Sequence, residues 1–258
     1  LAAHGFRVEK NFCGISTAYK ATYDTGKPGL TVAFLAEYDA LPGVGQGCGH
    51  NILGCTSLGA GVALKSVLDG IGGKVIVFGT PAEETSGAKV VFAEKGEFDC
   101  CDIAMMAHPS DANTRSGSSL ALMPVRFEFR GRAAHAAADP WDGVNALDAA
   151  IQTINAINAL REHVLPSSRI HGYIADGGVA ANIVPEYTRV DYYVRSTLKS
   201  YNETLVERIK DCARAGALAT GCTVEFTRYE LPYDNLVTNQ LLADTFAAAL
   251  FDLTGIVV

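Results

Sequence analysis

The stretch Leu30–Ala36 (LTVAFLA), with the loop Gly47–Asn51 (GCGHN) that follows it, decides the fold of this chain. The first segment is a short run of mostly apolar residues, which is typical of a β-strand covered on both faces. The loop leads into an apolar helix, in which Ser57 and Gly61 permit close approach to a sheet before Gly70 ends the helix. Strand, loop and helix in this order predict one unit of an α/β sheet.

Two more apolar runs, 74–79 and 102–107, flank a predicted short helix at 86–95. Strands that alternate with helices predict a mostly parallel sheet with helices on both faces. Ligands of such sheets bind beyond the carboxyl ends of the strands. Side chains suited to metal binding follow these strands or lie in the Gly-rich loop: Asp39, Cys48, His50, Glu83, Glu84 and His108.

The pattern changes near residue 119. Segments 119–230 alternate as β-α-β-β-α-β, the order of a ferredoxin-like α+β sandwich. Within them, Ser200 and Glu203 have the spacing of a capping box at the start of the second helix. We therefore expect a first domain over 1–118, an inserted second domain over 119–230, and a return to the first domain over 231–258.

Composition excludes several classes of protein. The chain has 258 residues, of which 48% are hydrophobic and 19% charged, so it is expected to be globular. A net charge of −7 without a basic stripe argues against nucleic-acid binding. Neither an apolar run long enough to span a membrane nor a leader peptide is evident, and the seven cysteines are scattered, which predicts a cytoplasmic protein with reduced thiols.

Two observations concern the ends of the chain. It begins with Leu1 in place of Met, and it stops at Val258 without an obvious terminal element. These features predict that the sequence is a fragment.

Cys48 and His50 can close on one cation, because the flanking glycines let the backbone bend tightly around it. The alternative is a small buried hydrophobic residue beside a hydrogen-bonded imidazole. Glu83 and Glu84 could likewise be a solvated surface pair, but they follow a buried strand, where one carboxylate can bind a cation while the other holds a water near it. That arrangement suits metal-assisted hydrolysis. A donor set of Cys, His, Glu and His (adding His108) favours Zn²⁺ over Mn²⁺ or Co²⁺.

Six motifs together resemble the zinc amidohydrolases and exopeptidases related to aminoacylase. The branch that is most similar contains aminobenzoyl-glutamate hydrolase, N-acyl-amino-acid amidohydrolases and auxin-conjugate hydrolases. The motifs are Leu35–Pro42 (LAEYDALP), Cys48–Asn51 (CGHN), Pro81–Glu84 (PAEE), His108–Pro109 (HP), Gly131–Ala136 (GRAAHA) and Asn182–Pro185 (NIVP).

The resemblance implies a site for two zinc ions in each subunit and a general base, Glu83, that activates the water between them. The metal ligands that it implies are Cys48, His50, Glu84 and His108.

For the inserted domain, the resemblance implies a lid through which a homodimer forms. His135 would then reach the active site of the partner subunit and stabilise the oxyanion, and Asn182 would contact the substrate. Arg195 could pair with a substrate carboxylate, or it could be an outward-facing arginine of a strand.

The chain departs from the family pattern in two places. Glu37 stands where Asp is usual, so we assign Asp39 only an indirect or structural role. Members also close the metal site with a histidine from a later segment, and no histidine follows His171 here. We expect either a truncated catalytic domain or a weakly held second metal.

The sequence therefore predicts a zinc-dependent amidohydrolase that cleaves the amide bond of N-acyl or aminobenzoyl amino acids or of dipeptides. One alternative is a non-catalytic binding protein that retains the fold and one metal. Another is a thiol hydrolase with Cys48 as nucleophile and His50 as base, which would leave Glu83 and Glu84 without a role.

Overall fold

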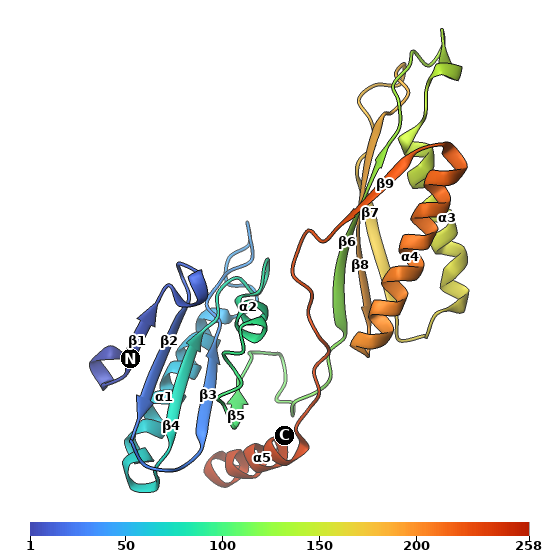
Figure 1. Ribbon diagram of the computed structural model, residues 1–258. Coiled ribbons are helices and arrows are strands. Elements are labelled where there is room, and N and C mark those ends of the chain that lie inside the picture. Colours follow the sequence, from blue (N-terminus) through green and yellow to red (C-terminus); the bar gives the residue numbers. More distant parts are fainter. Residues whose placement is uncertain (258) are drawn as a thin grey trace. The chain divides into compact units, whose positions relative to one another are not determined.

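The computed structural model describes residues 1–257, and the chain divides into two compact units, Leu1–Asn113 and Thr114–Val258 (Figure 1). Each unit has its own sheet and its own hydrophobic core.

The first unit contains a five-stranded mixed sheet in the order β1-β2-β4-β3-β5. The three strands that follow the α/β pattern are parallel to one another, as predicted. The two N-terminal strands add an antiparallel edge, because β1 and β2 form a hairpin whose second strand pairs with β4. The strands are β1 (Arg7–Lys10), β2 (Tyr19–Asp24), β3 (Thr31–Ala36), β4 (Lys74–Gly79) and β5 (Ile103–Met105).

Two helices, α1 (His50–Ile71) and α2 (Ala88–Glu94), cover opposite faces of this sheet (Figure 1). Val77 of β4 packs with Leu68 on the α1 side, and its neighbour Phe78 packs with Phe92 on the α2 side. Successive strand residues point to opposite faces, so one apolar strand supplies both cores. The predicted covering of both faces is confirmed.

Among residues 1–257, α1 is the one helix long and apolar enough to cross a membrane by length and composition. The expectation that no apolar segment has this length was therefore wrong. A core helix of a globular domain passes the same test, and α1 packs along β3 and β4.

The second unit contains an antiparallel sheet in the order β7-β8-β6-β9, with α3 and α4 side by side on one face (Figure 1). The helices approach closely at Gly216, where a Cβ would lie 2.5 Å from Thr153 Oγ1. This topology is the predicted ferredoxin-like sandwich. Its elements are β6 (Ala121–Arg130), α3 (Ala146–Leu160), β7 (Arg169–Asp176), β8 (Tyr187–Ser196), α4 (Lys199–Thr220) and β9 (Thr223–Thr227).

The predicted capping box of α4 was wrong. The helix begins one residue before Ser200, and its N-cap, Leu198, has no side-chain oxygen to offer. Instead, the Asn235 side chain accepts a hydrogen bond of 3.0 Å from the backbone N–H of Lys199. A distant segment thus supplies the cap, which local spacing could not indicate.

The last helix, α5 (Gln240–Thr254), falls within the second of the two units. Its start agrees with the cap at Asn239, whose side chain accepts from the Leu242 N–H. The return of 231–258 to the first domain stays a prediction.

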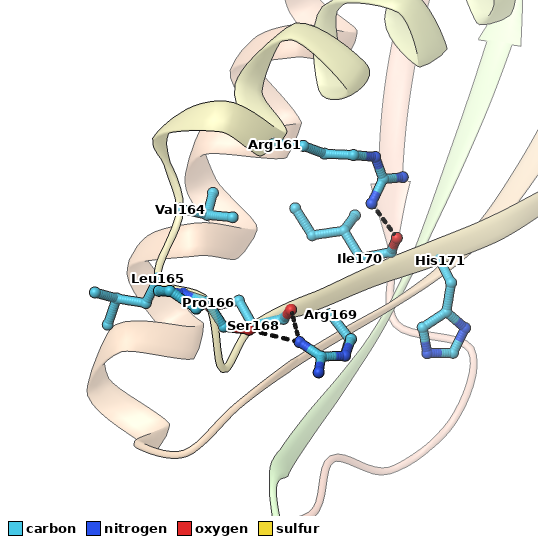
Figure 2. Close-up of a pocket in the computed structure, with 8 residues that line it drawn as sticks. All are labelled: Arg161, Val164, Leu165, Pro166, Ser168, Arg169, Ile170 and His171. Atoms are coloured by element: carbon cyan, nitrogen blue, oxygen red, sulfur yellow. Dashed lines mark hydrogen bonds between the residues drawn. The ribbon is translucent and has the colours of Figure 1, made fainter.

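A shallow pocket lies beside the start of β7 (Figure 2). Arg161 donates to the Ile170 carbonyl at 2.6 Å and so closes one side of it. His171 stands edge-on to Tyr193. Partial burial of the ring, with the positive charges of Arg195 and Arg161, lowers the pKa of His171 below its ordinary value.

Gly61 offers a test of the packing of α1 on the sheet. A Cβ at this position would lie 2.5 Å from Val77 Cγ2, whereas one at Gly59, on the outer side of the same helix, would meet no atom within 4 Å. Gly61→Ala should lower the free energy of unfolding by about 1–3 kcal/mol through overpacking. Gly59→Ala should raise it by roughly 0.5–1 kcal/mol, since alanine favours the helix. Urea denaturation followed by circular dichroism measures both, and equal shifts would contradict this packing.

The environment of His171 gives a second test. Arg195→Gln removes a neighbouring positive charge and should move the pKa of His171 upward, as measured by NMR titration of the ring protons. Arg214→Gln, on the outer helix α4, is the matched control and should leave the titration unchanged. An unaltered pKa in the Arg195 variant would show that the two side chains do not interact.

Candidate metal centre

The carboxyl ends of β3 and β4 are joined at Thr80. Its backbone N–H and its hydroxyl both donate to the Ala36 carbonyl, at 2.8 and 3.2 Å. The segments that begin with Glu37 and with Pro81 therefore leave the sheet side by side, which brings their carboxylates to one edge.

His50 occupies the first turn of α1, beside that edge. A Cβ at Gly54 would lie 2.6 Å from the Glu37 carbonyl oxygen, so the helix can approach the end of β3 only because position 54 is glycine. Ser57 completes the attachment by donating to the Leu35 carbonyl at 2.6 Å. The close approach buries the His50 ring completely.

The tautomer of His50 follows from its contact with Asp39. Nδ1 lies 3.1 Å from Asp39 Oδ1, and since an ionised carboxylate can only accept, Nδ1 is the donor; in the neutral imidazole, the form that binds a metal, Nε2 then carries the lone pair. The second oxygen of Asp39 accepts from the Glu84 N–H at 3.0 Å. Burial alone would raise the pKa of Asp39, but backbone hydrogen bonds, including those from Glu84 and Glu83, hold it below its ordinary value. Asp39 therefore orients both His50 and the Glu83–Glu84 segment, which is the indirect role predicted for it.

His108, three residues beyond β5, presents its free nitrogen in the same way. Nδ1 lies 2.8 Å from the Pro109 carbonyl oxygen, to which only an N–H can donate, so in the neutral ring Nε2 is again the nitrogen with the lone pair. That Nε2 lies 3.6 Å from Cys48 Sγ, and the ring stands edge-on to that of His50. Burial, then a hydrogen bond and the negative charge of Glu84, raise the pKa of Cys48 to about 11. This raised pKa makes the metal-free thiol a poor nucleophile, which disfavours the thiol-hydrolase alternative, whereas a bound cation would itself favour the thiolate.

Glu83 and Glu84 lie in a tight turn after β4. Ala82 has φ of +62°, an uncommon conformation for a residue with a side chain, and its carbonyl accepts from the Ser86 N–H at 2.9 Å. Burial raises the pKa of Glu83, the charges of Glu37 and Glu84 raise it further, and Lys89 opposes them. A carboxylate with a raised pKa is suited to accept a proton near neutral pH.

The donor atoms fit a divalent cation. Two groups, Cys48–His50–His108 and His50–Glu83–Glu84, each place one potential ligand atom per residue within 4.8 Å of the others. In the part of the chain that the structure describes, three buried atoms here lack a hydrogen-bond partner: His50 Nε2, Glu84 Oε1 and Glu37 Oε2. Buried polar atoms are rarely left unpaired, and a shared cation would satisfy all three. The structure thus brings together the five residues predicted for the first domain: Cys48, His50, Glu83, Glu84 and His108.

In the second unit, His135 and Asn182 lie next to one another. His135 forms a β-bridge with Ile183, and the Asn182 carbonyl accepts from the Ala136 N–H at 3.0 Å. His135 Nδ1 accepts from the N–H groups of Ala137 and Ala138, so the proton is on Nε2, on an exposed side chain.

Arg195 is not with this pair. It lies on β8 opposite Leu122, whereas the His135 loop leaves the far end of β6, where Arg130 pairs with Tyr187. Eight residues of strand separate Tyr187 from Arg195, about 26 Å at 3.3 Å per residue. The roles of all three side chains stay predictions.

Sequence reasoning missed Glu37 and Lys89 as parts of the centre. Glu37 is buried beside His50 and pairs with Lys89 of α2. The position of Glu37 directly after a buried strand was the available signal, whereas nothing in the spacing of Lys89 pointed to it.

The chain is similar to several known proteins. Residues 121–220 match the peptidase dimerisation domain of the M20 family. The chain is 40% identical to Xaa-Arg dipeptidase of Mus musculus, covering 95% of this chain and 58% of that protein. It is 33% identical to one of the two kinds of subunit of p-aminobenzoyl-glutamate hydrolase from Escherichia coli (strain K12). This match covers 97% of this chain and 56% of that subunit. One similar solved structure is the YXEP protein of Bacillus subtilis, which is described as a dinuclear metal binding peptidase from the M20 family. It matches with a TM-score of 0.66 and 17% sequence identity, over 98% of this chain and 71% of that protein.

The chain spans somewhat more than half the length of the curated relatives that it matches. Its sequence similarity extends over both units, and its fold is that of a peptidase with a dimerisation domain. The chain therefore carries an M20 peptidase dimerisation domain and is a homologue of M20 peptidases and amidohydrolases.

Proposed function

We propose that this chain forms the metal-binding and dimerisation parts of a zinc-dependent amidohydrolase that cleaves N-acyl amino acids or dipeptides. The observation that carries the proposal is the position of Glu83, a carboxylate with a raised pKa, beside a cluster of unpaired ligand atoms. The relatives support the substrate class, since their names describe hydrolysis of a dipeptide and of an aminobenzoyl amino acid.

Zinc is the cation that we propose, because thiolate, imidazole and carboxylate donors together suit it best, with Mn²⁺ or Co²⁺ as less favoured alternatives. The dinuclear site named for the Bacillus subtilis neighbour supports two ions per subunit. The two groups of donors share His50, whose single free nitrogen can bind only one of the ions. The bound cation would polarise the amide carbonyl and lower the pKa of water.

The protein residues then have separate tasks. Asp39 holds His50 in the tautomer that leaves Nε2 free, and the Pro109 carbonyl does the same for His108. Glu83 accepts the proton of the attacking water and returns it to the leaving amine, so that no proton is gained or lost over the cycle.

His135 Nε2–H is a donor suited to the developing oxyanion. We propose that it acts across a homodimer formed by the second unit. The match to a peptidase dimerisation domain supports the homodimer. The alternative is a heteromer, because p-aminobenzoyl-glutamate hydrolase is named with two different subunits.

Glu83→Gln tests the catalytic role. The amide retains the shape of the side chain but cannot accept the proton, so hydrolysis of an Xaa-Arg dipeptide, p-aminobenzoyl-glutamate or an N-acetyl amino acid should fall by roughly 10²- to 10⁴-fold. Zinc content by elemental analysis should stay close to that of the parent chain. Glu94→Gln, on the exposed side of α2, is the matched control. Full activity in the Glu83 variant contradicts the proposal.

Mixed dimers test whether His135 acts in trans. His135→Ala and Glu83→Gln should each be inactive alone. In a mixed dimer, however, one site receives an intact Glu83 from one chain and an intact His135 from the other. Co-refolded equal mixtures should therefore recover about a quarter of the parent rate, since half of the dimers are mixed and each has one complete site. No recovery, with dimers present by size-exclusion chromatography, would place His135 in its own subunit's site.

A further inference from the structure

The Glu37–Lys89 pair lies directly against the candidate metal centre, and neither the predicted ligand set nor the comparisons assign it a role. We infer that Glu37 is a further ligand of the centre, donating one carboxylate oxygen to the cation while Lys89 holds the other. This inference rests on the proposed metal-dependent function.

Burial shows that Glu37 is not a surface acid. Its side chain is 1% exposed, at the first position after β3. Charged carboxylates are almost never buried without a partner, because removal from water disfavours the ionised form. A buried carboxylate at the edge of a sheet therefore has its oxygens committed to specific neighbours.

The two oxygens of Glu37 have different surroundings. Oε1 accepts from Lys89 Nζ, which comes from the first turn of α2. Oε2 lies 3.2 Å from His50 Nε2. Over residues 1–257, neither Glu37 Oε2 nor His50 Nε2 has a hydrogen-bond partner. Lys89 thus occupies one side of the carboxylate and leaves the other facing the imidazole.

With His50 neutral, the form that binds a metal, this contact is not a hydrogen bond. Asp39 accepts a hydrogen bond from Nδ1–H, so in the neutral imidazole the lone pair of Nε2 faces Glu37 Oε2. The same Nε2 lies 3.9 Å from Glu84 Oε1, which is also unpaired within the described chain. Three electron-rich atoms that face one another in a buried site repel unless a positive charge lies among them.

A cation is the group that resolves this repulsion. It would accept the lone pairs of His50 Nε2, Glu84 Oε1 and Glu37 Oε2 together, in place of the hydrogen bonds that these atoms lack. Lys89 cannot do so, because its ammonium group is bonded to the opposite oxygen of Glu37. Its effect is to fix the carboxylate in the orientation that presents Oε2 to the centre, as the partners of metal ligands commonly do.

Glu37→Gln is the decisive variant, because it preserves size and hydrogen bonding while removing the anionic donor. Affinity for Zn²⁺, measured by competition with a chromophoric chelator, should fall by about 10- to 100-fold. The visible absorption spectrum of the Co²⁺-loaded chain should also change, which a purely structural role of Glu37 would not cause. The Glu94→Gln control should leave both measurements at the parent values.

Lys89→Met tests the orienting role separately. Loss of the ammonium group frees the carboxylate without removing it, so Zn²⁺ affinity should fall by less than in the Glu37 variant. If Glu37→Gln fails to fold, the affinity and the Co²⁺ spectrum of Lys89→Met decide the question, and parent-like values for both overturn the inference.

The outcomes separate this inference from the function on which it rests. Parent-like Zn²⁺ affinity and Co²⁺ spectrum in a folded Glu37→Gln variant overturn the ligand role alone, provided that the parent binds metal and Glu83→Gln still abolishes hydrolysis. A parent chain that binds no metal overturns both the inference and the proposed function.

Discussion

The buried negative charge around His50 is the constraint on which the first unit depends. Glu37, Asp39, Glu83 and Glu84 all lie at the carboxyl ends of β3 and β4, and their oxygens surround one fully buried imidazole. Backbone N–H groups and Lys89 neutralise part of this charge. Within residues 1–257, His50 Nε2 and the two carboxylate oxygens nearest to it, Glu37 Oε2 and Glu84 Oε1, lack a hydrogen-bond partner, which explains why the donor set fits a cation.

The fold maintains this arrangement through close backbone packing. Gly54 and Gly61, which have no side chain, let α1 lie against β3 and β4. Thr80 holds the ends of these strands together by hydrogen bonds to the Ala36 carbonyl. The positions of His50 and of the Glu83–Glu84 turn are therefore determined by contacts in the protein core. Side chains held on packed elements need little rearrangement when a ligand binds.

The second unit has a simpler architecture and a different contribution. Its antiparallel sandwich presents His135 and Asn182 on adjoining loop segments, at the end of the sheet where β6 pairs with the start of β8. The backbone N–H groups after His135 select the tautomer that exposes a donor. The first unit thus holds carboxylate, imidazole and thiol groups suited to bind a cation, and the second unit holds an exposed N–H donor.

Sequence alone determined the α/β architecture of the first unit, with its parallel strands, and the ferredoxin-like sandwich of the second, because strand periodicity is visible in the sequence. It also predicted that Cys48, His50, Glu83, Glu84 and His108 lie together, because residues that follow parallel strands meet at one edge of the sheet. Only the tertiary structure decided which nitrogen of each histidine is free, since this depends on Asp39 and the Pro109 carbonyl. It also decided the cap of α4 by Asn235 and the pairing of Glu37 with Lys89, 52 residues away. These contacts join segments far apart in the chain, and no local pattern encodes them. The same reason applies to Arg195: its strand was predictable, but its distance from His135 follows from the register of β6 with β8.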